Sequence, residues 1–338
     1  KYTSMKGENI VEKPKIVYLG TPEISANALK GLIESNLFEI VGVVTKPDQP
    51  VGRKMIMTPS PVALVASEYN IPIHKPIKLN KDYEFIEKLK PDLLLTFAYG
   101  QIISTKVLAL SKYKPLNVHA SLLPKYRGAA PIQYAIKDGE KVTGVSLMEM
   151  VKEMDAGDVY ATVKVDIDNN DNYTSLAQKV SKAGLELLIN YLPKYFNNEL
   201  VGVKQDESKV TFCPSIKKEE EHLDLNLSPN QFVNYVRALS ETPGAYLILD
   251  NQPFKIFKAR VKEYVDNNVA LGTIVNADKK GLIIKVNGGE VYLDEVQKAG
   301  KKKIDYKSFV NGEKNILGVI LKWQLQIEEL LTLLKLLW

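Results

Sequence analysis

Asn117 and His119 lie two positions apart, just before a loop rich in proline and glycine. In a strand, side chains two positions apart leave the same face, so both would point into the crevice at the carboxyl end of an open α/β sheet. An amide donor beside an imidazole can hold a developing oxyanion and move a proton, as transfer of an acyl group requires. An isolated histidine is more often a satisfied core residue, but this pairing favours a catalytic site.

Asp155 is the third candidate, in the tight loop Met154-Asp-Ala-Gly-Asp158 before an expected strand over 159–165. A carboxylate there could orient the imidazole and stabilise its cation. Aspartate is also a common turn residue, so only its combination with Asn117 and His119 gives it weight. The set holds no serine or cysteine nucleophile, which predicts direct transfer without a covalent enzyme intermediate.

Cysteine and histidine, the usual ligands of transition metals in proteins, are few in this chain. The chain has one cysteine, Cys213, and three histidines, His74, His119 and His222, with no metal-ligand spacing among them. A single cysteine makes no internal disulfide. We therefore expect a site without a metal, in a protein of a reducing compartment.

Continuous apolar runs at 15–19, 39–45 and 92–97 alternate with helical patterns such as 22–33. This alternation is typical of buried parallel strands, and it predicts an α/β domain with an open, mostly parallel, Rossmann-like sheet. The first turn, Gly20-Thr-Pro-Glu23, carries only one glycine of a dinucleotide fingerprint, and no G-x-x-x-x-G-K-[ST] motif occurs. These absences disfavour NAD and ATP as ligands.

A second domain follows a long amphipathic pattern over 173–195 and a boundary near Gly202. After one more helix, at 230–240, the pattern changes to period two and predicts five short strands of a small barrel. The strands are expected at 245–249, 254–261, 272–275, 282–286 and 291–293. The predicted domain limits are 14–202 for the first domain, 203–222 for a linker, 223–316 for the barrel and 317–338 for a tail.

The composition is that of an ordinary globular protein. Of the 338 residues, 45% are apolar and 25% are charged, and lysine plus arginine exceed the acids by only 5. A nucleic-acid partner would therefore have to be met by a local basic patch. Residues 1–14 contain no apolar core of a signal peptide, and four charges interrupt 317–338, so we expect a cytoplasmic protein without a membrane span.

The tail carries apolar residues at helical spacing, which predicts an amphipathic helix. These residues are Ile320, Trp323, Ile327, Leu330, Leu331, Leu334 and Trp338. Such a helix could dock on its own chain or mediate self-association. We expect a monomer unless the tail self-associates.

Three ordered motifs carry a family resemblance: Asn117-Val-His-Ala-Ser-Leu-Leu-Pro124, Arg127-Gly-Ala-Ala-Pro-Ile-Gln133 and Met154-Asp-Ala-Gly-Asp158. Together they resemble the formyltetrahydrofolate-dependent formyltransferases. Leu19-Gly-Thr-Pro-Glu23 and Thr45-Lys-Pro-Asp-Gln-Pro-Val-Gly-Arg-Lys54 are similar to the branch of that family whose members formylate methionyl-tRNA.

This resemblance implies an enzyme that passes the formyl group of N10-formyltetrahydrofolate to the α-amine of methionine on initiator methionyl-tRNA. It assigns catalysis to Asn117, His119 and Asp155. It assigns the folate cosubstrate to Ser121, Leu122, Leu123 and Pro124. It also implies a C-terminal barrel of the oligonucleotide-binding (OB) type.

Two basic segments are candidates for contact with tRNA. Arg53 and Lys54 lie in the stretch 47–59, whose proline and glycine content predicts an irregular loop, either a connector or a lid that orders on a polyanion. In the family this loop corresponds to the one at the acceptor stem. Lys301, Lys302 and Lys303 form a cationic strip on the expected barrel, which is either a phosphate contact or a solvated face.

Two other functions remain open from the sequence. A formyltransferase could act on a small amine, such as a sugar nucleotide or glycinamide ribonucleotide, although such an acceptor needs neither the basic loop nor the barrel. A catalytically idle RNA-binding protein could keep the fold, although the intact Asn117, His119 and Asp155 speak against it.

Overall fold

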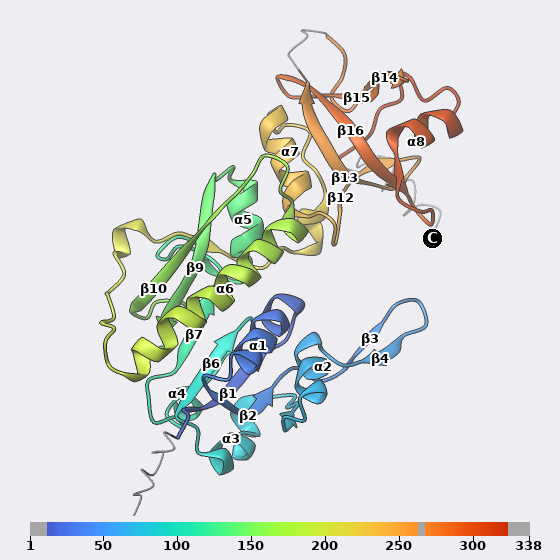
Figure 1. Cartoon of the computed structure of the whole chain (residues 1–338). Coiled ribbons are helices and arrows are strands. Elements are labelled where there is room, and N and C mark those ends of the chain that lie inside the picture. Colours follow the sequence, from blue (N-terminus) through green and yellow to red (C-terminus); the bar gives the residue numbers. More distant parts are fainter. Residues whose placement is uncertain (1–11, 263–267, 324–338) are drawn as a thin grey trace, which may run out of the picture. The chain divides into compact units, whose positions relative to one another are not determined.

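The computed structural model describes residues 12–262 and 268–323, which belong to two compact units (Figure 1). The first unit consists of Lys1–Arg127, Gly144–Val165 and Gln178–Thr211, and the second of Gly128–Thr143, Asp166–Ala177 and Phe212–Trp338. Two short stretches that precede the expected boundary near residue 202, Gly128–Thr143 and Asp166–Ala177, thus belong to the second unit.

The first unit is built on a seven-stranded sheet in the order β10-β9-β7-β6-β1-β2-β5. The strands are β1 (Lys15–Gly20), β2 (Glu39–Val44), β5 (Ile73–His74), β6 (Leu93–Phe97), β7 (Leu116–His119), β9 (Val142–Glu149) and β10 (Val159–Asp166). β1 pairs in parallel with β2 and β6, β6 with β7 and β2 with β5, whereas β7 and β9 are antiparallel. The prediction of an α/β, mostly parallel sheet is confirmed.

Helices cover both faces of this sheet, which explains why its central strands are apolar on both sides. On one face α6 packs on the sheet, since a side chain at Gly184 would touch Phe97, and Ser181 of α6 bonds to the backbone of Ile24 in α1 at 2.8 Å. On the other face Ile86 of α3 and Val107 of α4 share a core with β1 and β6. The helices are α1 (Glu23–Ser35), α2 (Pro61–Glu68), α3 (Glu84–Leu89), α4 (Thr105–Leu108) and α6 (Tyr173–Phe196).

The second unit contains a six-stranded sheet in the order β12-β13-β16-β15-β14, with β17 on β16, and its neighbouring strands are antiparallel. The strands are β12 (Ala245–Leu249), β13 (Gln252–Lys262), β14 (Ile274–Asp278), β15 (Gly281–Val286), β16 (Gly289–Lys298) and β17 (Ile304–Asp305). The turn from β12 to β13 uses Asp250 and Asn251, both at positive φ (50° and 58°), which matches the twist of the flanking strands.

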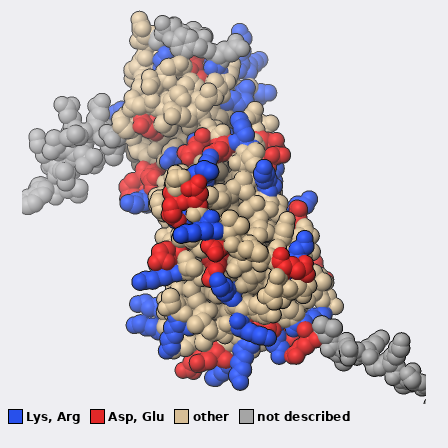
Figure 2. Space-filling model, turned by 90° about the vertical axis from the view of Figure 1, so that its left-hand side faces the viewer, with Lys and Arg blue, Asp and Glu red and all other residues tan. Residues whose placement is uncertain are grey.

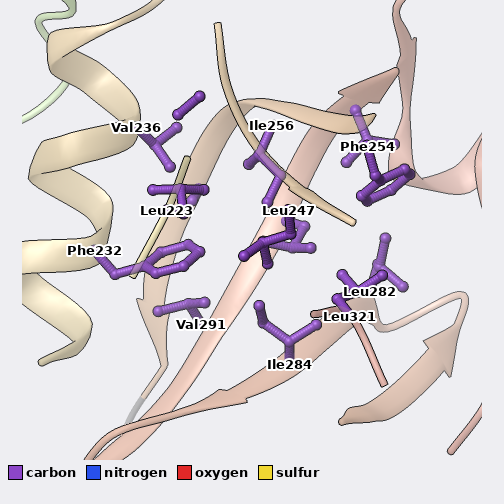
Figure 3. Packing of buried hydrophobic residues seen from close by; sticks show 14 of the residues in the cluster. Leu223, Phe232, Val236, Leu247, Phe254, Ile256, Leu282, Ile284, Val291 and Leu321 are labelled. Atoms are coloured by element: carbon purple, nitrogen blue, oxygen red, sulfur yellow. The ribbon is translucent and has the colours of Figure 1, made fainter. Parts of the chain in front are cut away.

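The apolar side chains of this sheet pack with those of two helices in one core (Figure 3). Phe232 and Val236 of α7 (Pro229–Ala238) and Phe309 of α8 (Tyr306–Gly312) are 0–1% exposed within it. Their partners alternate along the strands, as in Phe254 and Ile256 of β13. α5 (Pro131–Lys137) also belongs to this unit. The predicted antiparallel β domain is confirmed.

Residues 318–322 close the sheet instead of beginning a helix. Ile248 of β12 and Lys322 exchange backbone hydrogen bonds at 2.7 and 2.9 Å, and Leu321 donates to Gly272, which precedes β14, at 2.9 Å. The side chain of Leu321 is fully buried. The predicted helix is therefore wrong over 317–323, because backbone groups left open at the edges of the barrel bind this segment in extended form. The rest of the tail lies outside the described residues.

Shorter elements complete the description. They are the hairpin β3 (Gln49–Val51) and β4 (Ile56–Thr58), the pair β8 (Arg127–Gly128) and β11 (Phe212–Cys213), and single 3-10 turns at Leu79–Lys81, Glu207–Lys209 and Lys218–Glu221. Within 12–262 and 268–323, no helix combines the length and the apolar character needed to span a bilayer.

Candidate active site

Asn117 and His119 project from β7, which lies between β6 and β9 in the middle of the sheet. β7 is only four residues long, and the buried Val118 lies between Asn117 and His119 in it. The side chains of Asn117 and His119 therefore leave the same face of the strand, as their spacing predicted. His119 is the last residue of the strand. The structure therefore places both residues at the carboxyl end of a central parallel strand, where open α/β sheets bind ligands.

His119 is held between two oxygen atoms. Its Nε2 lies 2.7 Å from the backbone oxygen of Tyr126, and its Nδ1 lies 3.6 Å from Oδ2 of Asp155. A carbonyl oxygen only accepts hydrogen bonds, so Nε2 carries a proton and donates it. Nδ1 is then the nitrogen that can take up and release a proton beside the carboxylate. The side chain is 6% exposed.

Asp155 lies near His119 although it is 36 positions further along the chain. Its backbone is in the left-handed region (φ 52°), in a loop whose Gly157 has no space for a side chain, since a Cβ would lie 1.9 Å from the oxygen of Glu149. The separation of 3.6 Å exceeds a good hydrogen bond, so the contact is electrostatic in this state. The predicted pairing of His119 with Asp155 is present.

Asn117 has a fixed amide orientation. The hydroxyl of Thr96 on β6 donates to Oδ1 of Asn117 at 2.7 Å, and its oxygen also lies 3.3 Å from Sδ of Met150. Since Oδ1 is engaged, Nδ2 is the donor end of the amide that points elsewhere. Sequence reasoning missed Thr96, because its only signal was a polar residue within the apolar run of β6.

The loop Ser121–Pro124 is held by hydrogen bonds to Ser146 of β9. The hydroxyl of Ser146 donates to the backbone oxygen of Ser121 at 2.7 Å and accepts from the backbone nitrogen of Leu123 at 3.2 Å. Ser121 is buried, and its own hydroxyl donates to the oxygen of Lys125 at 2.6 Å. These hydrogen bonds define the shape of the loop.

Arg53 and Lys54 lie at the tip of a β-hairpin. The prediction of an irregular loop over 47–59 is therefore wrong. Val51 of β3 pairs with Ile56 of β4, and Gly52 (φ 73°) begins the turn. Proline did not prevent pairing, because a two-stranded ribbon leaves outward positions where no backbone N–H is needed. Both cations are exposed, together with apolar neighbours such as Met55 and Ile56, which are 65% and 61% exposed.

The three lysines of the barrel strip differ in their surroundings. Nζ of Lys303 lies 2.9 Å from Glu241 and 3.4 Å from Glu295, and the hydrogen bond to Glu241 is the main reason why the pKa of Lys303 is raised. Lys301 and Lys302 are exposed in the connection that leads to β17. Figure 2 shows basic and acidic side chains interleaved over the face that it presents, in keeping with a net charge of only +5.

A polar groove of about 730 Å³ in the second unit was not predicted. Its lining includes Asn234 and Arg237 of α7, Lys258 and Arg260 of β13, and Lys141. Its residues come from separate segments of the chain, so no single stretch of the sequence predicts the groove.

Among the described residues, no three His, Cys, Asp or Glu side chains are grouped so as to share a metal ion.

Comparison with known proteins matches this architecture. The family described as "Formyl transferase" matches residues 14–192, and "Formyl transferase, C-terminal domain" matches residues 215–314. Among solved structures, HypX from Aquifex aeolicus is similar with a TM-score of 0.62 at 20% identity, over 89% of this chain and 49% of that one. WlaRD, a sugar 3N-formyl transferase, gives 0.61 at 21% identity, over 86% and 100%. At these identities the likeness shows the fold.

Sequence relatives are much more similar. A methionyl-tRNA formyltransferase of Lactobacillus gasseri is 43% identical over 300 residues, which cover 88% of this chain and 95% of that protein. One of Malacoplasma penetrans is 42% identical over 315 residues, or 93% and 98%. Because both family matches and these long alignments agree, the chain belongs to the formyltransferase family, within the group of the methionyl-tRNA formyltransferases.

Proposed function

We propose that this protein transfers the formyl group of N10-formyltetrahydrofolate to the α-amine of methionine on initiator methionyl-tRNA. The observation that carries the proposal is the meeting of His119 with Asp155, at 3.6 Å, on the strand that also bears Asn117. It occurs in a chain whose relatives carry that activity in their names.

The reaction needs a proton acceptor and an oxyanion donor. The neutral amine attacks the formyl carbon, forming a carbon–nitrogen bond while the carbonyl electrons move to oxygen. When this intermediate collapses, the bond from the carbon to N10 of the folate breaks, and N10 takes up a proton. No covalent enzyme intermediate is required.

The three residues divide these tasks. Nδ2 of Asn117, aimed by the bond from Thr96, donates to the oxyanion. Nδ1 of His119 receives the proton of the attacking amine and returns it to N10, since Nε2 is occupied by the carbonyl of Tyr126. The carboxylate of Asp155 stabilises the imidazolium formed between these two transfers.

The loop Ser121–Pro124 is the proposed contact for the folate. Its shape is set by Ser146, and the hydroxyl of Ser121 is used within the loop. Contact with the cosubstrate would therefore come from the loop backbone and from Leu122, Leu123 and Pro124, which are half-buried.

Binding of the tRNA is proposed at two surfaces, one in each unit. In the first unit, Arg53 and Lys54 at the hairpin tip suit the acceptor end of the tRNA, because a guanidinium can pair with phosphate or stack on an unpaired base. In the second unit, Lys301 and Lys302 suit the phosphate backbone, whereas Lys303 is held by Glu241.

Transfer of labelled formyl from N10-formyltetrahydrofolate tests the proposal. Charged initiator methionyl-tRNA is expected to become labelled, and uncharged tRNA and free methionine to remain unlabelled. Labelling of an amino sugar nucleotide or of glycinamide ribonucleotide, without labelling of methionyl-tRNA, would replace the proposed acceptor by a small amine. Binding of tRNA without any transfer would favour a catalytically idle RNA-binding protein.

A further inference from the structure

Gln205 lies beneath the loop that carries Asp155. It is 7% exposed, and its Nε2 donates to the backbone oxygens of Asp155 at 2.7 Å and of Gly157 at 2.8 Å. A side-chain amide has two N–H groups, and both are used here. The two carbonyls on either side of Ala156 are thus fixed by one residue that lies 50 positions further along the chain.

Arg127 determines which way this amide points. Its Nε donates to Oε1 of Gln205 at 3.0 Å, and since a guanidinium only donates, the oxygen of the amide must face Arg127. The remaining guanidinium nitrogens bind Glu207 at 2.8 and 3.3 Å, and this contact lowers the pKa of the Glu207 carboxyl. Arg127 is 5% exposed, so the orientation of Gln205 is fixed by a buried partner.

The same segment also fixes the partner of His119. Oγ1 of Thr211 accepts a hydrogen bond from the backbone nitrogen of Tyr126 at 2.9 Å. The backbone oxygen of Thr211 accepts one from the backbone nitrogen of Arg127, also at 2.9 Å. Tyr126 is in the left-handed region (φ 61°), and its oxygen is the acceptor for Nε2 of His119. Thr211 therefore acts on His119 through one residue.

We propose that Gln205 and Thr211 are positioning residues that set the geometry between His119 and Asp155. One holds the backbone of Asp155 and the other holds the carbonyl that orients the imidazole. The segment 205–211 thus connects both members of the pair across the separation of 3.6 Å. This inference rests on the catalytic roles proposed above for His119 and Asp155.

The physical reason is the sensitivity of proton transfer to distance. A displacement of about 1 Å in a catalytic group costs roughly a hundredfold in rate. Without Gln205 the carbonyls of Asp155 and Gly157 lose their donors, and a shift of this loop toward other donors moves Asp155 as well. The effect should fall on turnover, because neither Gln205 nor Thr211 is placed in contact with a substrate.

The test compares Gln205→Met, which keeps the length of the side chain and removes both donors, with Ser208→Ala as a control in the same segment. Ser208 is exposed, and its backbone nitrogen and hydroxyl both donate to the carboxylate of the nearby Asp206. We expect Gln205→Met to lower kcat for methionyl-tRNA about ten- to a hundredfold, with both KM values nearly unchanged. The thermal midpoint should fall by a few degrees, because the variant leaves buried polar groups without partners. Ser208→Ala should retain the parent kcat.

Thr211 provides a second variant that does not depend on a buried substitution, since this residue is exposed. Thr211→Val keeps the shape of the side chain but loses the hydroxyl acceptor, so it should lower kcat. Thr211→Ser keeps the hydroxyl and should have a kcat close to that of the parent protein. In the background of Asp155→Asn, Gln205→Met should add little further loss, because a positioning residue acts through the group that it positions.

The outcomes separate the two proposals. If His119→Ala and Asp155→Asn keep full turnover, the proposed catalytic roles fail. If those variants are inactive but Gln205→Met and Thr211→Val keep kcat within about twofold of the parent, the positioning inference alone is overturned. An additive loss in the double variant Gln205→Met, Asp155→Asn would likewise contradict it.

Discussion

At the scale of single residues, each ring nitrogen of His119 faces an oxygen atom of different chemical character. The carbonyl of Tyr126 at 2.7 Å fixes the proton on Nε2, and the carboxylate of Asp155 at 3.6 Å faces Nδ1. This division allows one nitrogen to anchor the ring while the other exchanges a proton. In the neutral ring Nδ1 carries no hydrogen to donate, so a separation of 3.6 Å from the carboxylate of Asp155 is consistent with this proton placement.

We therefore expect His119→Ala and Asp155→Asn each to reduce kcat by at least about a hundredfold, because they remove groups that act on the transition state. The free energy of unfolding and the affinity for methionyl-tRNA should change little. The measurement is steady-state formylation together with binding of charged tRNA. Turnover equal to that of the parent protein would remove these residues from the mechanism.

At the scale of elements, the hairpin β3–β4 presents Arg53 at its tip on a defined ribbon. A cation on a short ribbon can approach a phosphate or an unpaired base without ordering a long loop first. The exposed Met55 and Ile56 beside it add apolar surface that a tRNA end could cover.

Arg53→Leu should weaken the use of methionyl-tRNA and lower the slope of log affinity against log salt by up to about one, because one phosphate contact is lost. Folate affinity should not change. Lys88→Leu is the matched control, since Lys88 is an exposed cation of the first unit that lies on α3. The same loss in both variants would indicate a general charge effect instead of a contact at the hairpin.

The connection between β16 and β17 allows a similar comparison within one run of lysines. Lys302→Glu should weaken tRNA binding more as salt is lowered, because an exposed cation acts through long-range attraction. Lys303→Met should leave the salt slope nearly unchanged, since Lys303 is already engaged by Glu241 and Glu295. Equal effects on the salt slope would show that the internal ion pairs do not withhold Lys303 from the tRNA.

At the scale of the whole molecule, the last described residues complete the barrel of the second unit. Leu321 is fully buried in its core, and its neighbours bridge β12 and the start of β14. A closed sheet leaves fewer backbone groups without partners at its edges than an open one. The segment 318–322 is thus part of the domain and not an appendage.

Leu321→Ala should lower the free energy of unfolding of the second unit by about 2–5 kcal/mol, through lost burial and the cavity left behind. Urea denaturation measures this change, and Leu317→Ala is the control because Leu317 is 64% exposed. A loss below about 1 kcal/mol for Leu321→Ala would mean that the segment contributes little to the closure of the barrel.

The amino-acid sequence by itself determined the elements and the chemical types at the site. The runs that became β1 and β6, five of the six strands in the sheet of the second unit, and the shared face of Asn117 and His119 all follow from local apolar periodicity. Only the tertiary structure decided the approach of Asp155 to His119, the partners of Lys303, the pairing of the hairpin and the extended course of 318–322. Gln205 and Thr96 belong to this second group. Apart from the hairpin, whose strands are close in the sequence, each depends on hydrogen bonds or charges between segments distant in the chain. Such contacts leave no periodic pattern in the sequence.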